Sequence, residues 1–524
     1  MQFSDNNVLI VGGVLLVHPS PCAVTIARCP MLRLVFTLFF CAVPLAAQTM
    51  PPEADKQLAH DIYKEFVEIR SGFTTGSTTP VAEAAAARLR AAGFPDADIF
   101  VGGANPNKAN LVVRYHGTGS RKPLLLLAHT DVVEAKREDW SMDPFQLIER
   151  DGFFYGRGTS DDKAQAAVWI ASLIRYRREG FKPHRDIIVA LTADEEGGGP
   201  YNGVDWLIKN HRELIDAELA LNEGGWGESD AGRKISNDLQ VSEKYAINFR
   251  FEVRNKGGHS SLPVPDNAIY HLAGALERLS HFGFPLKTNE VTAAYFQKMA
   301  KIETGPVSED LAKVPEGSQE AMQRVAAASP AWNATLRTTC VATQLEGGHA
   351  MNALPQLAAA NVNCRVLPED SLEYVRNGLQ KVMADDQVTV RVVGDPSKGP
   401  ASPMRPDVLN TISHVTSQLW PGVPVVPTMV MGATDGKSLR AAGIPTYGVQ
   451  GFFMDRNDLR FHGRDERMSV QSFYEGQTFL YELVKILSKA GESIAALPPG
   501  SSQDLAEAAV GGTSERAHKI VQIL

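Results

Sequence analysis

Three stretches of the chain are apolar without alternation, and each is soon followed by polar or acidic residues. They are residues 124–128 before His129, residues 187–193 before Asp194, and residues 219–221 before Glu223. Unbroken apolar runs of this length are typical of parallel strands buried on both faces of a sheet. Because ligands in an open α/β sheet bind beyond the carboxyl ends of the strands, we expect these polar side chains to share one site.

Helical patterns lie between the apolar runs. Helices are expected over residues 55–70 and 81–93, a strand over 110–117, and a glycine-rich loop leading into a helix within 151–180. Strands that alternate with helices in this way indicate an α/β domain built on a parallel sheet.

The pattern changes at Lys244, where apolar and polar positions begin to alternate as in a strand with one exposed face. Further strands follow up to about residue 394, with helices at 267–279 and 369–384 and a loop-rich, helical stretch at 285–332. The α/β pattern then resumes and ends in a helix at 470–488. We therefore predict an α+β domain over 244–394, inserted between two parts of the α/β domain at 50–243 and 395–490.

The first 48 residues are predicted to be a leader, and residues 491–524 a tail. Within the leader, residues 31–48 have a basic start, an apolar centre and a small-residue end, which is the pattern of a signal peptide. A retained membrane anchor is the alternative, but the apolar segment is short for a permanent span. We expect a secreted or periplasmic protein with no stable membrane span once the signal is removed.

Composition narrows the possible partners. The chain has 524 residues, too many for a single core, and its net charge of −8 without a Lys/Arg-rich block argues against a nucleic-acid partner. Three of the five cysteines lie in the leader, so only Cys340 and Cys364 remain, enough for one disulfide at most. A cysteine-ligated zinc site is therefore not expected.

The polar residues that follow the strands have the chemistry of a metal site. Two imidazoles and several carboxylates without a thiolate suit zinc or a similar divalent ion, and the set is large enough for two ions if one carboxylate bridges them. A helix-capping role alone could explain one of the adjacent Asp161 and Asp162. The set consists of His129, Asp161, Glu195, Glu196, Glu223 and His462.

The short motifs HTDVV, GRGTSDDK, TADEEGGG, NEGG, GGHSS and HGRDER occur in this order along the chain. Together they resemble the zinc-dependent M20 metallopeptidase family over about residues 55–490. The resemblance implies a zinc-peptidase-like, three-layer α/β catalytic domain with an inserted α+β dimerisation (lid) domain. It also implies a homodimer and two zinc ions per chain, with cobalt or manganese as alternatives.

The resemblance assigns a role to each residue of the metal set. His129 and Glu223 would bind one ion, Glu196 and His462 the other, and Asp161 would bridge them. Asp131 would orient His129, and Glu195 would be the general base. The setting of Glu223, NEGG, departs from the commoner Glu-Pro form of the family.

Four further residues are implied by the same resemblance. His259 would reach the active site of the neighbouring subunit and stabilise the oxyanion, although a turn histidine is the alternative interpretation. Asn352 and Arg365 would bind the carboxylate of the substrate, for which an arginine fork is well suited. Asp435 would lie near the specificity pocket.

The expected reaction is hydrolysis of an amide bond next to a free carboxylate, by a water that the two metal ions activate. Small peptides or N-acyl amino acids are the expected substrates, as for a carboxypeptidase, dipeptidase or aminoacylase. Two alternatives stay open: hydrolysis of ureido or other C–N bonds on the same fold, and a non-catalytic homodimeric binding protein.

Overall fold

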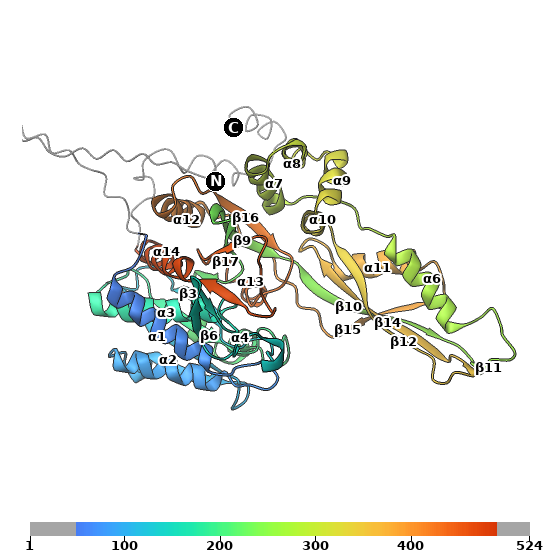
Figure 1. Cartoon of the computed structure of the whole chain (residues 1–524), viewed down its shortest axis with the longest axis horizontal. Helices are drawn as coiled ribbons and strands as arrows, with labels where there is room; N and C mark the ends of the chain where they lie inside the picture. Colours follow the sequence, from blue (N-terminus) through green and yellow to red (C-terminus); the bar gives the residue numbers. More distant parts are fainter. Residues whose placement is uncertain (1–48, 490–524) are drawn as a thin grey trace, which may run out of the picture. The chain divides into compact units, whose positions relative to one another are not determined.

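The computed structural model describes residues 49–489; the predicted leader with its signal peptide and the predicted tail lie outside the described residues. The largest element is a ten-stranded sheet (Figure 1). Along its main path the strands are β1 (Ile99–Gly103), β2 (Ala109–Tyr115), β6 (Ile187–Thr192), β3 (Leu124–His129), β7 (Leu219–Asn222), β17 (Thr446–Gly448), β9 (Arg233–Glu243), β8 (Gly227–Asp230) and β18 (Phe453–Asp455), while β16 (Val425–Val430) pairs with β9.

The three apolar runs form the centre of this sheet. β3 pairs in parallel with both β6 and β7, and every residue of the three strands is buried. Alternate side chains enter two different cores: Leu124 and Leu126 belong to one, Leu125 and Leu127 to the other. A strand with a core on each side must be apolar at every position, which is the pattern that the sequence showed.

Helices cover both faces of the sheet, so the domain has three layers as expected. The core that contains Leu124 also contains α1 (Glu53–Glu68), α2 (Thr79–Ala91), α3 (Lys163–Glu179), α12 (Pro406–Leu419) and α14 (Val470–Ser488). The opposite core contains α4 (Gly203–Asn210), α5 (Arg212–Ile215) and α13 (Gly436–Ala441). Two short 3-10 helices, η1 (Asp96–Asp98) and η2 (Arg137–Asp139), lie in connecting loops.

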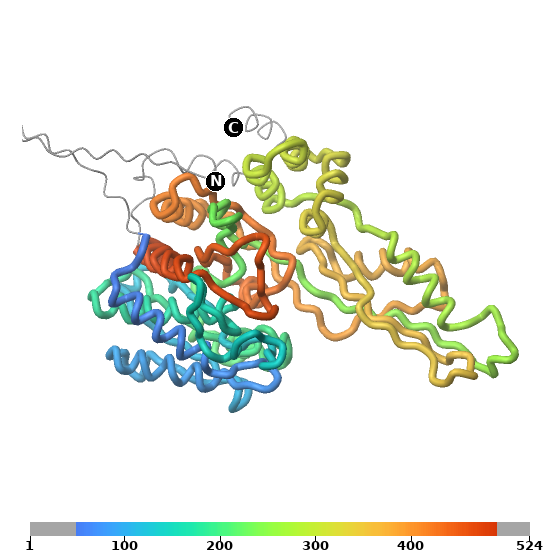
Figure 2. The backbone as a smooth tube through the Cα atoms, in the orientation of Figure 1, coloured from blue at the N-terminus to red at the C-terminus, as the bar shows by residue number. Residues whose placement is uncertain are grey.

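A four-stranded antiparallel sheet forms the lid domain, in the order β12 (Thr339–Gly347), β14 (Leu357–Val366), β10 (Tyr245–Arg254) and β15 (Thr389–Val393). The helices α6 (Ala268–Ser280) and α11 (Leu372–Met383) cover one face. Cys340 and Cys364 are directly opposite each other on β12 and β14 and form a disulfide. The chain leaves the large sheet after β9, in green, and rejoins it at β16, in orange, after α12 (Figure 2).

The stretch predicted as loop-rich and helical contains four helices, α7 (Glu290–Ile302), α8 (Pro306–Lys313), α9 (Gln319–Ala328) and α10 (Pro330–Leu336). They have a small core of their own. Val291 and Ala294 of α7, however, belong to the core of the catalytic domain, and α7 contacts β16 and β9. Although this stretch lies inside the predicted lid boundaries of 244–394, part of it thus packs with the catalytic domain.

Two small sheets complete the described part of the chain. β19 (Arg467–Ser469), β5 (Phe153–Tyr155) and β4 (Ile148–Arg150) form one, and the pair β11 (Gly258–His259) and β13 (Ala353–Leu354) forms the other. Among residues 49–489, no helix is both long enough and apolar enough to cross a membrane.

Candidate active site

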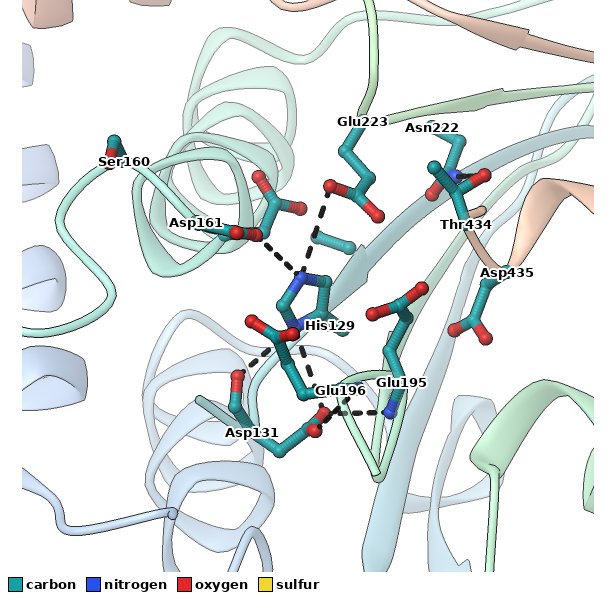
Figure 3. A network of polar contacts seen from close by, with 12 residues as sticks. His129, Asp131, Ser160, Asp161, Glu195, Glu196, Asn222, Glu223, Thr434 and Asp435 are labelled. Carbon is teal, nitrogen blue, oxygen red and sulfur yellow. Dashed lines mark hydrogen bonds and ion pairs between the residues drawn. The ribbon is translucent and has the colours of Figure 1, made fainter. Parts of the chain in front are cut away.

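The polar residues that follow the central strands come together at one edge of the large sheet. His129 ends β3, Glu195 and Glu196 follow β6, and Glu223 follows β7. Their side chains point toward one another, with Asp161 beside them (Figure 3). Two overlapping groups have ligand atoms within 4.8 Å of one another: His129 with Glu195 and Glu223, and His129 with Asp161 and Glu196.

Asp161 lies between the two imidazoles of the predicted metal set. Its Oδ1 is 3.0 Å from Nε2 of His129, and its Oδ2 is 3.1 Å from Nε2 of His462. Glu196 Oε1 is 3.0 Å from the same His462 nitrogen, and Glu223 Oε2 is 3.9 Å from Nε2 of His129. The predicted pairs, His129 with Glu223 and His462 with Glu196, are therefore each brought together, with one carboxylate between them.

These distances fit two metal positions. Two ligand atoms bound about 2.1 Å from one tetrahedral ion are about 3.4 Å apart. The four separations of 3.0–3.9 Å bracket that value. The donor set of imidazole nitrogens and carboxylate oxygens is one that zinc, cobalt or manganese accepts. Residues and geometry thus fit the two-metal site that the motifs implied.

Asp131 contributes in two ways. Nδ1 of His129 lies 3.0 Å from the backbone carbonyl of Asp131 and 3.7 Å from its Oδ1, so the hydrogen bond to the ring comes from the backbone of Asp131. The carboxylate of Asp131 also accepts the backbone N–H groups of Glu195, at 3.1 Å, and Glu196, at 3.0 Å. One buried residue therefore holds the first imidazole through its backbone carbonyl and the turn that carries the two glutamates through its side chain.

A second contact to this turn was not predicted. Asp194, the residue before Glu195, has a left-handed backbone with φ of 60°, and its Oδ1 accepts a bond of 2.8 Å from Nζ of Lys108. The same nitrogen donates to the carbonyl of Phe73. Asp194 could have been singled out, because it opens the acidic run DEE, but no sequence signal connects it to Lys108, 86 residues earlier.

The site crowds negative charge around two imidazoles. Burial raises the pKa of Glu195 and of Glu223 well above the usual value, and the neighbouring carboxylates add to this although His129 opposes it. Hydrogen bonds donated by His462 to the carboxylates of Asp161 and Glu196 raise the pKa of His462 to about 10. Burial alone would lower the pKa of His129, but the surrounding carboxylates outweigh it and raise it well above the usual value. A bound cation would relieve this excess of negative charge.

Asp435 is buried beside Glu195 (Figure 3). Its carboxylate accepts bonds from Asn202 Nδ2, at 2.6 Å, and Thr192 Oγ1, at 2.9 Å. Burial raises the pKa of Asp435 to about 6. Both carboxylate oxygens of Asp435 are thus already hydrogen-bonded, one to Thr192 on β6 and one to Asn202 before α4. A contact between Asp435 and the substrate would be additional to these bonds.

The lid residues singled out from the sequence lie on two different elements. His259 on β11 is opposite Ala353 on β13, and the backbone N–H of Ser260 donates to the carbonyl of Asn352. His259 is exposed, and its Nδ1 is 2.7 Å from the hydroxyl of Ser261. Arg365 lies on β14, between the core residues Cys364 and Val366, and is half-buried. The fold therefore brings His259 and Asn352 together from 93 positions apart, while Arg365 lies on another strand.

A family model described as peptidase family M20/M25/M40 matches residues 125–486. Among curated proteins, the human N-fatty-acyl-amino acid synthase/hydrolase PM20D1 is 29% identical over 375 residues, which cover 70% of this chain and 74% of the human protein. The probable carboxypeptidase S-like 2 of Dictyostelium discoideum is also 29% identical, over 399 residues that cover 73% of this chain and 75% of that protein.

Solved structures show the same fold. The M20 family metallo-carboxypeptidase of Sulfolobus solfataricus superposes with a TM-score of 0.60 at 16% identity, covering 82% of this chain and 98% of that one. At this level of identity the similarity establishes the fold, including both the three-layer catalytic domain and the inserted lid.

Proposed function

We propose that the substrates of this protein are N-acyl amino acids or small peptides with a free carboxylate. The chain belongs to the peptidase family M20/M25/M40 and is a metal-dependent hydrolase of peptide or N-acyl amino acid bonds. The observation that carries this proposal is the position of Asp161, with one carboxylate oxygen on each imidazole and Glu195 alongside. The similarity to an N-fatty-acyl-amino acid hydrolase and to a carboxypeptidase S-like protein favours this substrate class.

Two divalent cations would be held by His129, Glu223, Glu196, His462 and Asp161. Bound there, the cations would polarise the scissile carbonyl and acidify the attacking water. Glu195 accepts the proton of that water and passes it to the leaving nitrogen, a role that suits a carboxylate whose pKa is raised. Asp131 keeps Glu195 at a fixed distance from His129 through the backbone bonds described above.

Zinc is the proposed native metal. Two imidazoles and several carboxylates without a thiolate are typical of catalytic zinc sites, and cobalt or manganese would bind the same donors. Arg365 and Asn352 are proposed to bind the carboxylate of the substrate, and His259 to donate to the developing oxyanion, since an imidazole N–H stabilises such charge.

We further propose a homodimer formed by the lid. β12 is an edge strand of the lid sheet, and among residues 49–489 its outer edge pairs with no strand. Leu345 on this strand is 74% exposed, and Ile269 and Tyr270 of the adjacent α6 are also exposed. An apolar edge of this kind is normally covered, and a second copy of the chain would cover it.

Export is the proposed destination. The signal-like segment at residues 31–48 supports it, and so does the disulfide between Cys340 and Cys364, because disulfides persist in oxidising compartments.

The experiment is amino-acid release from a panel of substrates, measured with zinc-loaded protein and again after chelation. The panel contains N-acyl amino acids with short and long acyl chains, dipeptides and N-carbamoyl amino acids. We expect chelator-sensitive cleavage of the N-acyl amino acids or dipeptides. Replacing the free carboxylate of the best substrate by an amide should lower kcat/KM by about 10- to 100-fold, because a charged hydrogen-bond partner is lost.

Two results would contradict the proposal. Cleavage of the N-carbamoyl compounds alone would indicate a ureido hydrolase on the same fold. Equal cleavage of the substrate with a free carboxylate and of its amide would show that the enzyme does not recognise the free carboxylate.

A further inference from the structure

The two loops that carry Asp161 and His462 come from distant parts of the sequence. The two residues are 301 positions apart, yet they contact each other at 3.1 Å. His462 has a left-handed backbone, with φ of 59°, and its side chain is 52% exposed. An exposed ligand on a loop needs other contacts to hold it in place.

Arg157 supplies contacts to the loop of His462. Its Nη2 donates to the backbone carbonyls of His462, at 3.2 Å, and Gly463, at 3.0 Å, and its Nη1 is 2.6 Å from Oε2 of Glu466. The guanidinium also lies over the ring of Trp140. Arg157 precedes Asp161 by four residues, so it belongs to the loop of the bridging carboxylate and binds the loop of the second imidazole.

Glu466 makes the reciprocal contacts. Its Oε1 accepts bonds from the backbone N–H and the hydroxyl of Ser160, at 2.8 and 2.9 Å, and its Oε2 accepts from the N–H of Gly158 at 3.3 Å. Its own carbonyl accepts from the N–H of Gly156. The residue directly before Asp161 is therefore bound by a side chain four residues after His462.

The ion pair between Arg157 and Glu466 is almost completely enclosed, with side chains 3% and 1% exposed. A buried pair of this kind adds little net stability, because removing two charges from water offsets their attraction. The pair instead fixes geometry. The guanidinium of Arg157 and the carboxylate of Glu466 each make several hydrogen bonds, and these bonds set the separation of the two loops.

We propose that Arg157 and Glu466 are positioning residues that set the distance between Asp161 and His462. They would thereby control the affinity of the metal position formed by Glu196, His462 and Asp161, and leave the position of His129 and Glu223 largely unchanged. This inference rests on the two-metal function proposed above.

The test is a metal titration of the full chain after chelation, followed by calorimetry, with thermal unfolding of the metal-free protein measured in parallel. Glu466→Gln keeps the size of the side chain but removes its charge, and Arg157→Lys keeps the charge but loses the fork. The matched control is Asp458→Asn, which removes the ion pairs with Arg460 and Arg467 in the loop that also carries His462; in these pairs Asp458 makes no contact with the loop of Asp161.

We expect the wild type and the control to bind two zinc ions per chain. Both test variants should bind one ion with unchanged affinity and the second about 10- to 100-fold more weakly, since residues behind metal ligands typically have effects of this size. The metal-free Arg157→Lys protein should unfold within a few degrees of the wild type, whereas metal-free Glu466→Gln should unfold at a lower temperature, because Arg157 is then buried without a charge partner.

Two tight zinc ions in both variants would overturn the inference. So would a parallel loss of both ions together with a large drop in the unfolding temperature of the metal-free variants, because that is the result of a merely structural role. A wild type that binds fewer than two ions would contradict the two-metal function itself, and the inference with it.

Discussion

At the scale of single residues, the site separates the roles of two adjacent glutamates. Glu195 and Glu196 share a turn, and Asp131 accepts both of their backbone N–H groups. Their side chains nevertheless join different groups: Glu196 contacts His462, while Glu195 lies with His129 and Glu223. With the backbone fixed, one carboxylate is available to bind a metal and the other to move a proton.

Glu195→Gln tests this division. The amide cannot accept the proton of the attacking water, so kcat should fall by at least about 100-fold. Both metal ions should stay bound, because no proposed ligand is changed. Steady-state kinetics and the metal content after dialysis measure the two quantities, and Glu196→Gln is the matched variant, in which metal binding should weaken. Retained turnover in Glu195→Gln would remove Glu195 from the role of base.

At the scale of elements, β9 shows where the apolar pattern was not sufficient. This strand crosses the large sheet, yet its sequence, RKISNDLQVSE, is mostly polar, and no strand was predicted there. Its buried polar groups are bonded to distant partners: Asn237 donates to Thr416, and Glu243 accepts from Thr434. Because these partners come from other elements, periodicity along the chain cannot show that such a strand is buried.

Asp238 on β9 predicts a pH effect. Burial, with a contribution from Glu228 and against that of Arg456, raises its pKa to about 7. From about pH 4, the usual pKa of an aspartate, up to 7, the folded protein keeps a proton that the unfolded chain releases. The stability that this group contributes is therefore fully present below about pH 4 and is lost as the pH rises from 4 to 7.

Relative to the wild type, Asp238→Asn, which stays neutral, should gain about 2.7 kcal/mol of stability between pH 5 and pH 8, because the wild type loses about 1.4 kcal/mol per pH unit up to pH 7. Thermal unfolding of both proteins at the two pH values, in the same buffer ions, measures the difference. A stability difference between variant and wild type that is the same at pH 5 and pH 8 would show that the pKa of Asp238 is not raised in the folded protein.

At the scale of the whole molecule, the inserted domain leaves an edge to be covered. The lid sheet has two outer strands, β12 and β15, and both are exposed. β12 is in contact with α6, on which the apolar side chains of Ile269 and Tyr270 are exposed, whereas β15 is in contact with α11. This difference is what leads us to place the dimer interface at β12.

Leu345→Lys should convert the proposed dimer into a monomer, because the lysine would place a charge in the apolar edge. Val393→Lys is the matched control: Val393 is 48% exposed on β15, at the opposite edge of the same sheet, and this variant should stay dimeric. Light scattering after size exclusion gives the mass. A dimeric Leu345→Lys, or a monomeric Val393→Lys, would put the interface elsewhere. If His259 acts across the interface, the monomer should also lose most of its turnover.

The amino-acid sequence by itself determined the fold class and the residue types of the candidate metal site. The apolar runs before His129, Asp194 and Glu223 became β3, β6 and β7, because burial on both faces of a sheet leaves a local signature along the chain. The motifs HTDVV, TADEEGGG and HGRDER are also local, because each lies within a few residues. They could therefore indicate the types of metal ligand directly from the sequence.

Tertiary structure alone decided which residues hold these ligands in place. Three contacts join positions that are far apart in the chain: Lys108 with Asp194, Arg157 with Glu466, and α7 with the catalytic domain. Nothing in the spacing of these residues along the sequence predicts the contacts. Such contacts depend on how the layers pack. Packing brings together segments whose sequences do not indicate that they are partners. Ligand identity is local chemistry, whereas ligand position is a property of the folded molecule.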